Sequence, residues 1–304
     1  MLIYSHEHCL EHAVQAHHPE RADRLRAVTE RLRACGIADQ AQLVEAPNVA
    51  REDVALAHTQ PYRQLLDQLL PESGIAQLDP DTALCPRSLE AASRAAGAVT
   101  AAARAVIDGD DQRAFCAVRP PGHHAEADAG MGFCLYNSVA IAARAVLADG
   151  DVSRVAILDF DVHHGNGTVD IFADDPRVMV CSSYQHPFYP NRQHDVMRDH
   201  IVHTPLAVGT DGDAYRRAVS ESWFDAVTRF APELIIVSAG FDAHEDDPLA
   251  GLRLQPEDFR WVTEQIVSLA QSSASGRIVS ALEGGYDLNA LADSVETHVG
   301  ALAA

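Results

Sequence analysis

The chain has 304 residues, of which 47% are hydrophobic and 22% are charged, so it can bury a large core, and its composition excludes a disordered protein. Its formal net charge of −21 argues against nucleic-acid binding, because neutralising phosphates requires clustered Lys and Arg residues. No segment approaches about eighteen uncharged apolar residues and the N-terminus lacks a signal-peptide pattern, so we expect a cytoplasmic protein without a membrane span. The acidity would favour a cationic substrate, although solubility alone also accounts for it.

The first third of the chain is predicted to be largely helical. A short strand at residues 2–4 leads into a polar, histidine-rich connection that ends at Glu20. Three segments carry apolar residues at helical spacing and are predicted to be helices: 22–34, 53–70 and 88–107. Residues 71–86 are rich in Pro, Gly and Asp, which indicates a long loop of the kind that often forms a functional rim.

The rest of the chain repeats one order, in which an apolar strand is followed by a polar motif and then by a helix. Five apolar runs are predicted to be strands: 115–118, 155–158, 178–181, 234–237 and 278–282. Three helical segments supply the crossovers that parallel strands require: 138–147, 213–230 and 256–271. The pattern predicts a single α/β domain over residues 1–304, with helices flanking a mostly parallel sheet whose strand ends deliver polar groups to one rim.

The clearest motif follows the apolar run 155–158. Asp159, Asp161 and His163 alternate along an extended chain, so we expect them to share one face. Asp and His at the carboxyl end of a parallel strand suit a divalent metal, and Asp242, in another strand-end loop, is the best further ligand. Each of these residues alone could be a capping acid or a packed imidazole. Together, Asp161, His163 and Asp242 predict a metal site that leaves a position open for water and substrate.

Two other strand-end loops carry groups suited to acid–base and oxyanion chemistry. His123 and His124 are adjacent imidazoles on a Pro-Pro-Gly turn, and histidine titrates in the range that a general base and a general acid need. Tyr286 follows two glycines, and its phenol could donate a hydrogen bond to the oxyanion that develops when water attacks an amide carbonyl. The alternatives are a histidine pair that fills space and a tyrosine that packs its ring.

Aromatic residues in polar loops suggest a substrate slot. Phe133 follows Gly132, and Phe188 lies in a Phe-Tyr-Pro sequence. Two facing rings would line a narrow slot for an alkyl chain, although core packing of one of them is nearly as well supported.

Taken together, the motifs resemble the histone deacetylase superfamily, which also contains acetylpolyamine amidohydrolases and bacterial histone deacetylase-like amidohydrolases. Four sequences carry the resemblance: PGHHA at 121–125, DFDVHHGNG at 159–167, AGFDAH at 239–244 and EGGY at 283–286. It extends from His18-Pro19-Glu20 through residues 78–82 to the C-terminus. It implies an arginase/deacetylase fold with the active site at the carboxyl ends of the strands.

The resemblance also implies zinc on Asp161, His163 and Asp242 and the removal of an acetyl group from an N-acetylated amine. Acetyl-lysine in proteins or peptides is the leading substrate class, and acetylpolyamine is the alternative. In such enzymes His123 and His124 would act on the water and the leaving amine, and Tyr286 would polarise the carbonyl. Asp159 would pair with His123, and Asn166 with His124, where the Asn is similar to class II enzymes.

Further binding residues follow only from the resemblance. A potassium ion next to the zinc would use five residues, Asp161 and His163 through backbone oxygens: Asp159, Asp161, His163, Ser182 and Ser183. A second monovalent cation would bind near three backbone carbonyls: Phe172, Asp175 and Val178. The substrate would contact residues of the slot and of the tyrosine loop: Gly132, Phe133, Phe188, Gly284 and Gly285. The loop of Phe188 departs from the commoner Phe-Phe-Pro sequence by carrying Tyr189.

Two other functions compete with this interpretation. A ureohydrolase with two manganese ions would share the fold, but Asn166 lacks the charge that a second metal favours. A non-catalytic acyl-lysine binding module would keep the pocket, but retention of every proposed catalytic group argues against it. The chain could also form a homo-oligomer, as bacterial relatives often do, and no sequence stripe identifies an interface.

Overall fold

The protein is described here by a computed structural model that covers residues 1–13, 15 and 18–304. Part of the expected histidine-rich connection, residues 14, 16 and 17, lies outside the described residues. Eight strands form the central sheet: β1 (Leu2–Ser5), β2 (Gln42–Glu45), β5 (Arg113–Cys116), β6 (Val155–Asp159), β7 (Val178–Gln185), β8 (Ile201–Leu206), β9 (Leu234–Ala239) and β10 (Ile278–Leu282). Their order is β2-β1-β5-β10-β9-β6-β7-β8, and every neighbouring pair is parallel. The predicted parallel α/β sheet is therefore confirmed.

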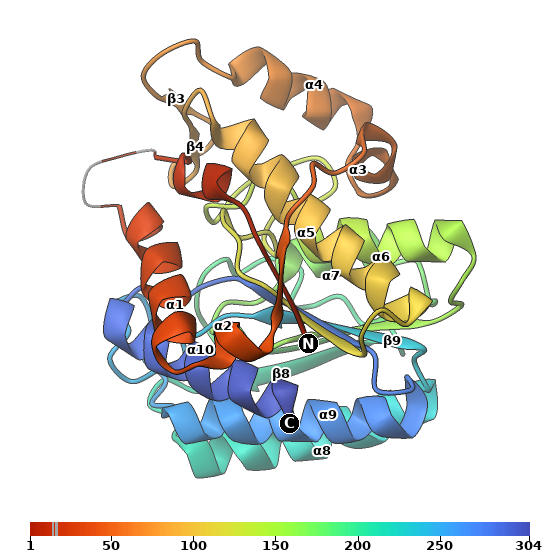
Figure 1. The fold of residues 1–304 in the computed structure, drawn as a ribbon. Helices are drawn as coiled ribbons and strands as arrows, with labels where there is room; N and C mark the ends of the chain where they lie inside the picture. The colour runs from red at the N-terminus through yellow and green to blue at the C-terminus, as the bar shows by residue number, and fades with distance from the viewer. Residues whose placement is uncertain (14, 16–17) are drawn as a thin grey trace.

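Helices cover both faces of this sheet. They are α1 (Ala22–Ala34), α2 (Ile37–Gln40), α3 (Arg51–Ala57), α4 (Gln60–Leu69), α5 (Ser88–Asp108), α6 (Ser138–Asp149), α7 (Asn166–Phe172), α8 (Gly212–Phe230), α9 (Pro256–Ser273) and α10 (Leu288–Ala303), with a short 3-10 turn at Glu7–Leu10. In Figure 1, α8, α9 and α10 lie below the sheet, and α5 and α6 lie above it. Among the described residues, no helix combines the length and the apolar character that crossing a membrane would need.

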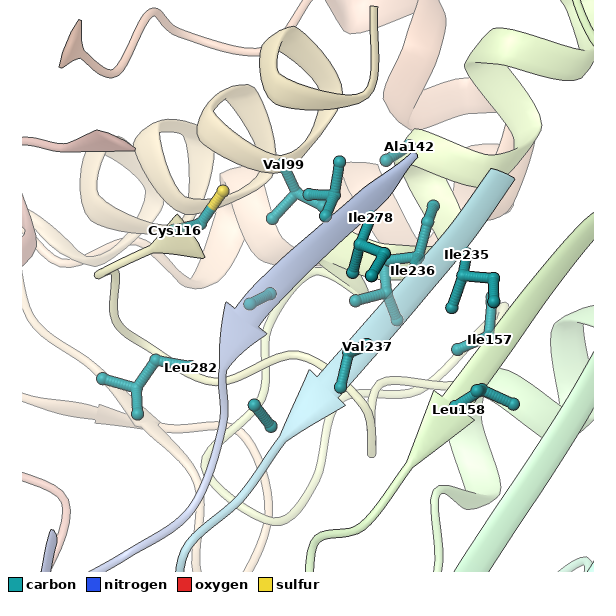
Figure 2. Close-up of a cluster of buried hydrophobic side chains, with 14 of the residues drawn as sticks. Val99, Cys116, Ala142, Ile157, Leu158, Ile235, Ile236, Val237, Ile278 and Leu282 are labelled. Atoms are coloured by element: carbon teal, nitrogen blue, oxygen red, sulfur yellow. The ribbon is translucent and has the colours of Figure 1, made fainter. Parts of the chain in front are cut away.

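Coverage on both faces explains why the central strands have uninterrupted apolar sequences. Ile235 and Ile236 are consecutive in β9 and point to opposite faces, yet both are fully buried. Their partners in the neighbouring strands are Ile278 in β10 and Ile157 in β6. Figure 2 shows these four side chains on three adjacent strands, with Val99 on the neighbouring helix α5. Neither face of these strands is exposed to solvent, so neither face carries the polar residues of a half-exposed sheet.

Several elements differ from the sequence expectation. The helix predicted at 53–70 is two helices, because the Thr59 side chain caps α4 by accepting from the amide of Tyr62, and a proline occupies the first turn. The loop at 71–86 contains a small antiparallel hairpin formed by β3 (Ala76–Gln77) and β4 (Ala83–Leu84). Besides this hairpin and the 3-10 turn, five elements were not predicted: β2, β8, α2, α7 and α10. The two strands among them are the edges of the sheet, where partial exposure removes the continuous apolar run.

A buried ion-pair network ties the N-terminal segment to the sheet. Glu20 accepts two hydrogen bonds from Arg119, at 2.6 and 2.5 Å, and one from Arg24, at 3.2 Å. All three side chains are almost completely buried. Burial alone would raise the pKa of Glu20, but the charge and hydrogen bonds of Arg119 outweigh it and lower the pKa to about 2. The stabilising contribution of ionised Glu20 is therefore present above its ordinary pKa and is lost as the pH falls from there toward about 2.

Replacing Arg119 with alanine is expected to destabilise the fold by about 3–5 kcal/mol, because it leaves a buried carboxylate with too few partners. Chemical denaturation at neutral pH measures the change. Arg198→Ala is a matched control, since Arg198 is half-exposed and pairs with an exposed Asp174, and its loss should cost less than about 1 kcal/mol. Equal stability of the two variants would show that the network does not stabilise the fold.

Candidate metal centre

The expected site residues meet at the carboxyl ends of four adjacent strands. His123 and His124 follow β5, Asp161 and His163 follow β6, Asp242 follows β9, and Tyr286 follows β10. The strands β5, β10, β9 and β6 are neighbours in that order, so parallel pairing brings their carboxyl ends to one edge. The sequence prediction of one shared rim is borne out by this topology.

Three side chains form a compact donor cluster. Ligand atoms of Asp161, His163 and Asp242 all lie within 4.8 Å of one another, and no second cluster of this kind occurs in the described part of the chain. His163 Nδ1 is 3.2 Å from Asp161 Oδ1 and 3.1 Å from Asp242 Oδ2. Backbone amides orient the carboxylates, since His163 N and Gly284 N donate to Asp161, and Val162 N donates to Asp242, each at 2.9 Å.

The reason for this convergence differs from the expected one. Strand β6 ends at Asp159, so Asp161 and His163 lie in the turn beyond it and strand alternation does not place them. Instead, the backbone at Gly240 and Gly284 lies close to the two carboxylates and leaves space for them. A Cβ atom at Gly240 would lie 1.9 Å from Asp161 Oδ2, and one at Gly284 would lie 2.2 Å from Asp242 Oδ2. Only glycine leaves room for both carboxylates.

The chemistry of the donors fits a divalent metal. Two carboxylates can only accept, so a neutral His163 that pointed its Nδ1 lone pair at both of them would be repelled. A hydrogen on Nδ1 or a metal ion must therefore lie between them. Burial would lower the pKa of His163, but Asp161 and Asp242 raise it to about 10. Burial and then the charge of Asp161 raise the pKa of Asp242. Asp, His and Asp are oxygen and nitrogen ligands that suit zinc.

The two adjacent imidazoles have different partners and opposite pKa shifts. His123 Nδ1 lies 2.9 Å from Asp159 Oδ2, and His124 Nδ1 lies 2.7 Å from Asn166 Oδ1. Burial, then the neighbouring His123 and His163, lower the pKa of His124 well below its ordinary value. Burial acts in the same direction on His123, but Asp161 and Asp159 outweigh it and raise its pKa well above the ordinary value. The environments of the two imidazoles therefore shift their pKa values in opposite directions.

Tyr286 is partly buried beside the donor cluster. Its ring contacts Phe133 edge-on at 5.9 Å between centroids, and the Arg24 guanidinium lies 4.8 Å from its ring centroid. Arg24 also donates to the carbonyl oxygens of Glu283 and Gly285, at 2.5 and 2.6 Å. Gly285 has a φ of 118°, which favours glycine. The two glycines before Tyr286 are thus required for different reasons: Gly284 leaves room for the carboxylates, and Gly285 adopts a positive φ.

Two positioning residues were missed by the sequence reasoning. Glu283 accepts from the amides of Gly122 and His123, at 2.6 and 3.2 Å, and so holds the turn of the histidine pair. Asp247 accepts from the amide of Tyr286 at 2.7 Å. Glu283 begins the EGGY sequence at 283–286, so the motif itself could have indicated a role for it. Nothing near Asp247 in the sequence indicates that it binds the amide of Tyr286.

Phe188 and Tyr189 both pack on the imidazoles of the site, but Tyr189 contacts two of them and Phe188 contacts one. Phe188 stacks on His163 with centroids 5.5 Å apart. Tyr189 packs edge-on against both His124 and His163, at 5.3 and 5.9 Å, and so has more contact with the imidazoles than Phe188 has. Its position before Pro190 was the available signal. Gly132 lies directly against His124, because a Cβ there would be 2.3 Å from the imidazole ring.

The residues expected to bind monovalent cations lie along β6 and the turn after it, along β7, and at the turn between α7 and β7. Asp159 and Ser182 are register partners in β6 and β7, and Ser183 Oγ donates to the Asp159 carbonyl at 3.5 Å. Phe172 ends α7, Val178 begins β7, and Asp175 lies in the turn between them. The Asp175 carboxylate pairs with Arg144 and Arg177. Binding of cations at either place stays a prediction.

Comparison with known proteins gives consistent matches over nearly the whole chain. The family model for the histone deacetylase domain matches residues 18–302. The chain is 36% identical to a probable deacetylase of Archaeoglobus fulgidus over 294 residues, which cover 94% of this chain and 81% of that protein. It is also 36% identical to a histone deacetylase-like amidohydrolase of Pseudomonas aeruginosa, with coverage of 89% and 73%. The crystal structure of the HDA15 HD domain matches with a TM-score of 0.92 at 31% identity, covering 99% of this chain and 88% of that chain.

Proposed function

This chain belongs to the histone deacetylase family, and we propose that it is a zinc-dependent amidohydrolase that removes the acetyl group from an N-acetylated amine. The observation that carries the proposal is the convergence of a three-residue donor cluster with two differently tuned imidazoles and a tyrosine at one sheet edge. These are the parts that amide hydrolysis needs: a metal site, a proton acceptor, a proton donor and an oxyanion donor.

Asp161, His163 and Asp242 would hold the zinc ion. When bound, the zinc supplies Lewis-acid polarisation of the amide carbonyl and lowers the pKa of a water molecule. His124 is neutral and keeps its Nδ1 hydrogen on Asn166, so its Nε2 accepts the proton of the attacking water. His123, held protonated beside Asp159 and Asp161, donates a proton to the leaving amine. Tyr286 stabilises the developing oxyanion.

Acetyl-lysine in proteins or peptides is the leading substrate class, because the matched relatives include histone deacetylases. Acetylpolyamine is the second candidate, since the net charge of −21 suits a cationic substrate. A kinetic panel of an acetyl-lysine peptide, acetylputrescine and acetylspermidine, each with and without a chelator, tests the proposal. Turnover that a chelator abolishes and zinc restores supports it. A purified protein that binds the acetyl-lysine peptide without hydrolysing any of the substrates would instead be a binding module.

Tyr286→Phe is expected to lower kcat by about 10²- to 10³-fold, because it deletes only the hydroxyl that donates to the oxyanion. Affinity for a non-hydrolysed acyl-lysine analogue should change little, since the ring and the apolar slot are kept. Steady-state kinetics and a separate binding titration measure the two quantities. Near-normal turnover would make Tyr286 a packing residue, and a parallel loss of analogue binding would assign it to holding substrate.

A further inference from the structure

A chain of four side chains leads from the catalytic imidazole to the surface. His124 Nδ1 meets Asn166 Oδ1 at 2.7 Å, and Asn166 Nδ2 donates to Glu126 Oε1 at 2.8 Å. Arg192 then binds Glu126 with both arms of its guanidinium, at 3.0 and 2.5 Å. Glu126 and Asn166 are buried, whereas the Arg192 side chain is 53% exposed. The family resemblance gave a role to Asn166 but none to Glu126 or Arg192.

The direction of each hydrogen bond follows from the chemistry of the last carboxylate. Glu126 is paired with Arg192, so it is ionised and can only accept. The Asn166 amide must therefore turn its NH₂ group to Glu126 and its oxygen to His124. That oxygen only accepts, so the His124 ring must carry a hydrogen on Nδ1, and in its neutral form this is the single ring hydrogen. Nε2 is then the free lone pair, which is the form that a general base needs.

Arg192 connects this chain to the substrate loop. It lies two residues after Pro190, in the loop whose Phe188 and Tyr189 pack on His163. Glu126 comes two residues after His124, in the turn after β5. The pair therefore joins two loops that both border the site, and it supplies the positive charge that a buried carboxylate requires.

We propose that Glu126 and Arg192 are positioning residues that fix the Asn166 amide and thereby keep the hydrogen of His124 on Nδ1. This inference rests on the proposed function for its kinetic consequence, but the position of the hydrogen is independent of activity. Loss of this acceptor should leave the Asn166 NH₂ group with only its 3.4 Å contacts to His124 O and Met131 Sδ. The amide could then turn, so that part of the His124 population carries its hydrogen on Nε2 and cannot act as a base.

Two variants of Glu126 separate hydrogen bonding from charge. Glu126→Gln and Glu126→Met both remove the negative charge and are close in size, but only glutamine keeps an oxygen that can accept from Asn166. Glu126→Met is expected to lower kcat by about 10- to 100-fold, by analogy with partners that orient metal-bound histidines, with KM nearly unchanged. Glu126→Gln should keep most of the wild-type kcat. Equal losses in both variants, or no loss in either, would overturn the proposal.

A spectroscopic readout tests the same point without turnover. In zinc-loaded protein with ¹⁵N-labelled histidine, the His124 signal, assigned by its absence in His124→Ala, should show the hydrogen on Nδ1 in wild type and in Glu126→Gln. Glu126→Met should shift part of the population to Nε2. An unchanged position in Glu126→Met would overturn the proposal even if kcat fell. Inactive wild-type protein with the expected shift would sink the proposed function and leave the positioning role standing.

Arg192→Ala completes the test and guards against a Glu126→Met variant that fails to fold. It should lower kcat less than Glu126→Met does, because Glu126 keeps its acceptor oxygens, and Arg192→Lys should recover part of the loss. Arg198→Ala is the matched control, since Arg198 is similarly exposed in the following segment and pairs with Asp174 instead. An effect of Arg192→Ala no larger than that of Arg198→Ala would remove Arg192 from the proposal.

Discussion

Asp242→Ala is expected to lose bound zinc and turnover together, the largest effect of any substitution considered for this protein. In the proposed site Asp242 would supply one of the three ligands found among the described residues, and its Oδ2 lies 3.1 Å from His163 Nδ1. Its other oxygen accepts from the Val162 amide, so the substitution also loosens the turn that carries the remaining ligands. Elemental analysis of the purified variant and an assay at saturating substrate measure the two losses.

Asp246→Ala is the matched control for this experiment. Asp246 is in the same loop but its side chain is 70% exposed, so zinc content and turnover should match those of wild type. Full zinc occupancy in Asp242→Ala would contradict the ligand assignment. A folded, zinc-free Asp242→Ala with normal turnover would contradict metal dependence itself.

His124→Ala is expected to lose most turnover while it keeps its zinc. A positioned proton-transfer residue contributes about 10²- to 10⁴-fold, and the ring of His124 is held by Asn166 rather than by the donor cluster. The zinc content of the variant is the internal control, because an unchanged value shows that the site has not collapsed. The rate should be measured across the pH range, since the remaining activity would depend on other groups.

Retention of more than about a tenth of the wild-type rate in His124→Ala would mean that the general base lies elsewhere. Loss of zinc along with turnover would instead mean that His124 supports the donor cluster. The contact that makes this outcome worth testing is the edge-on packing of His124 against His163, with centroids 5.8 Å apart.

Most of the fold and the inner site could be predicted from the sequence because the signals are local. A run of apolar residues that ends in acids, imidazoles and glycines, as at 155–167, marks a buried parallel strand and its carboxyl end without any knowledge of partners. The same pattern occurs at β5, β9 and β10, and it predicted that His123, Asp242 and Tyr286 belong to the same site. Parallel pairing then requires these ends to share an edge.

The tertiary structure decided what depends on contacts between distant residues. Edge strands such as β2 have no local apolar signature, and the break between α3 and α4 depended on a cap and a proline within one apolar pattern. The partner of Glu126 is 66 residues away, and the amide of Tyr286 meets an Asp247 that is 39 residues away. Sequence alone determined which chemical groups reach the rim, because the end of an apolar strand and the polar motif after it are local properties of the chain. Only the folded chain determined which of those groups orient one another, because hydrogen bonds between loops follow from packing.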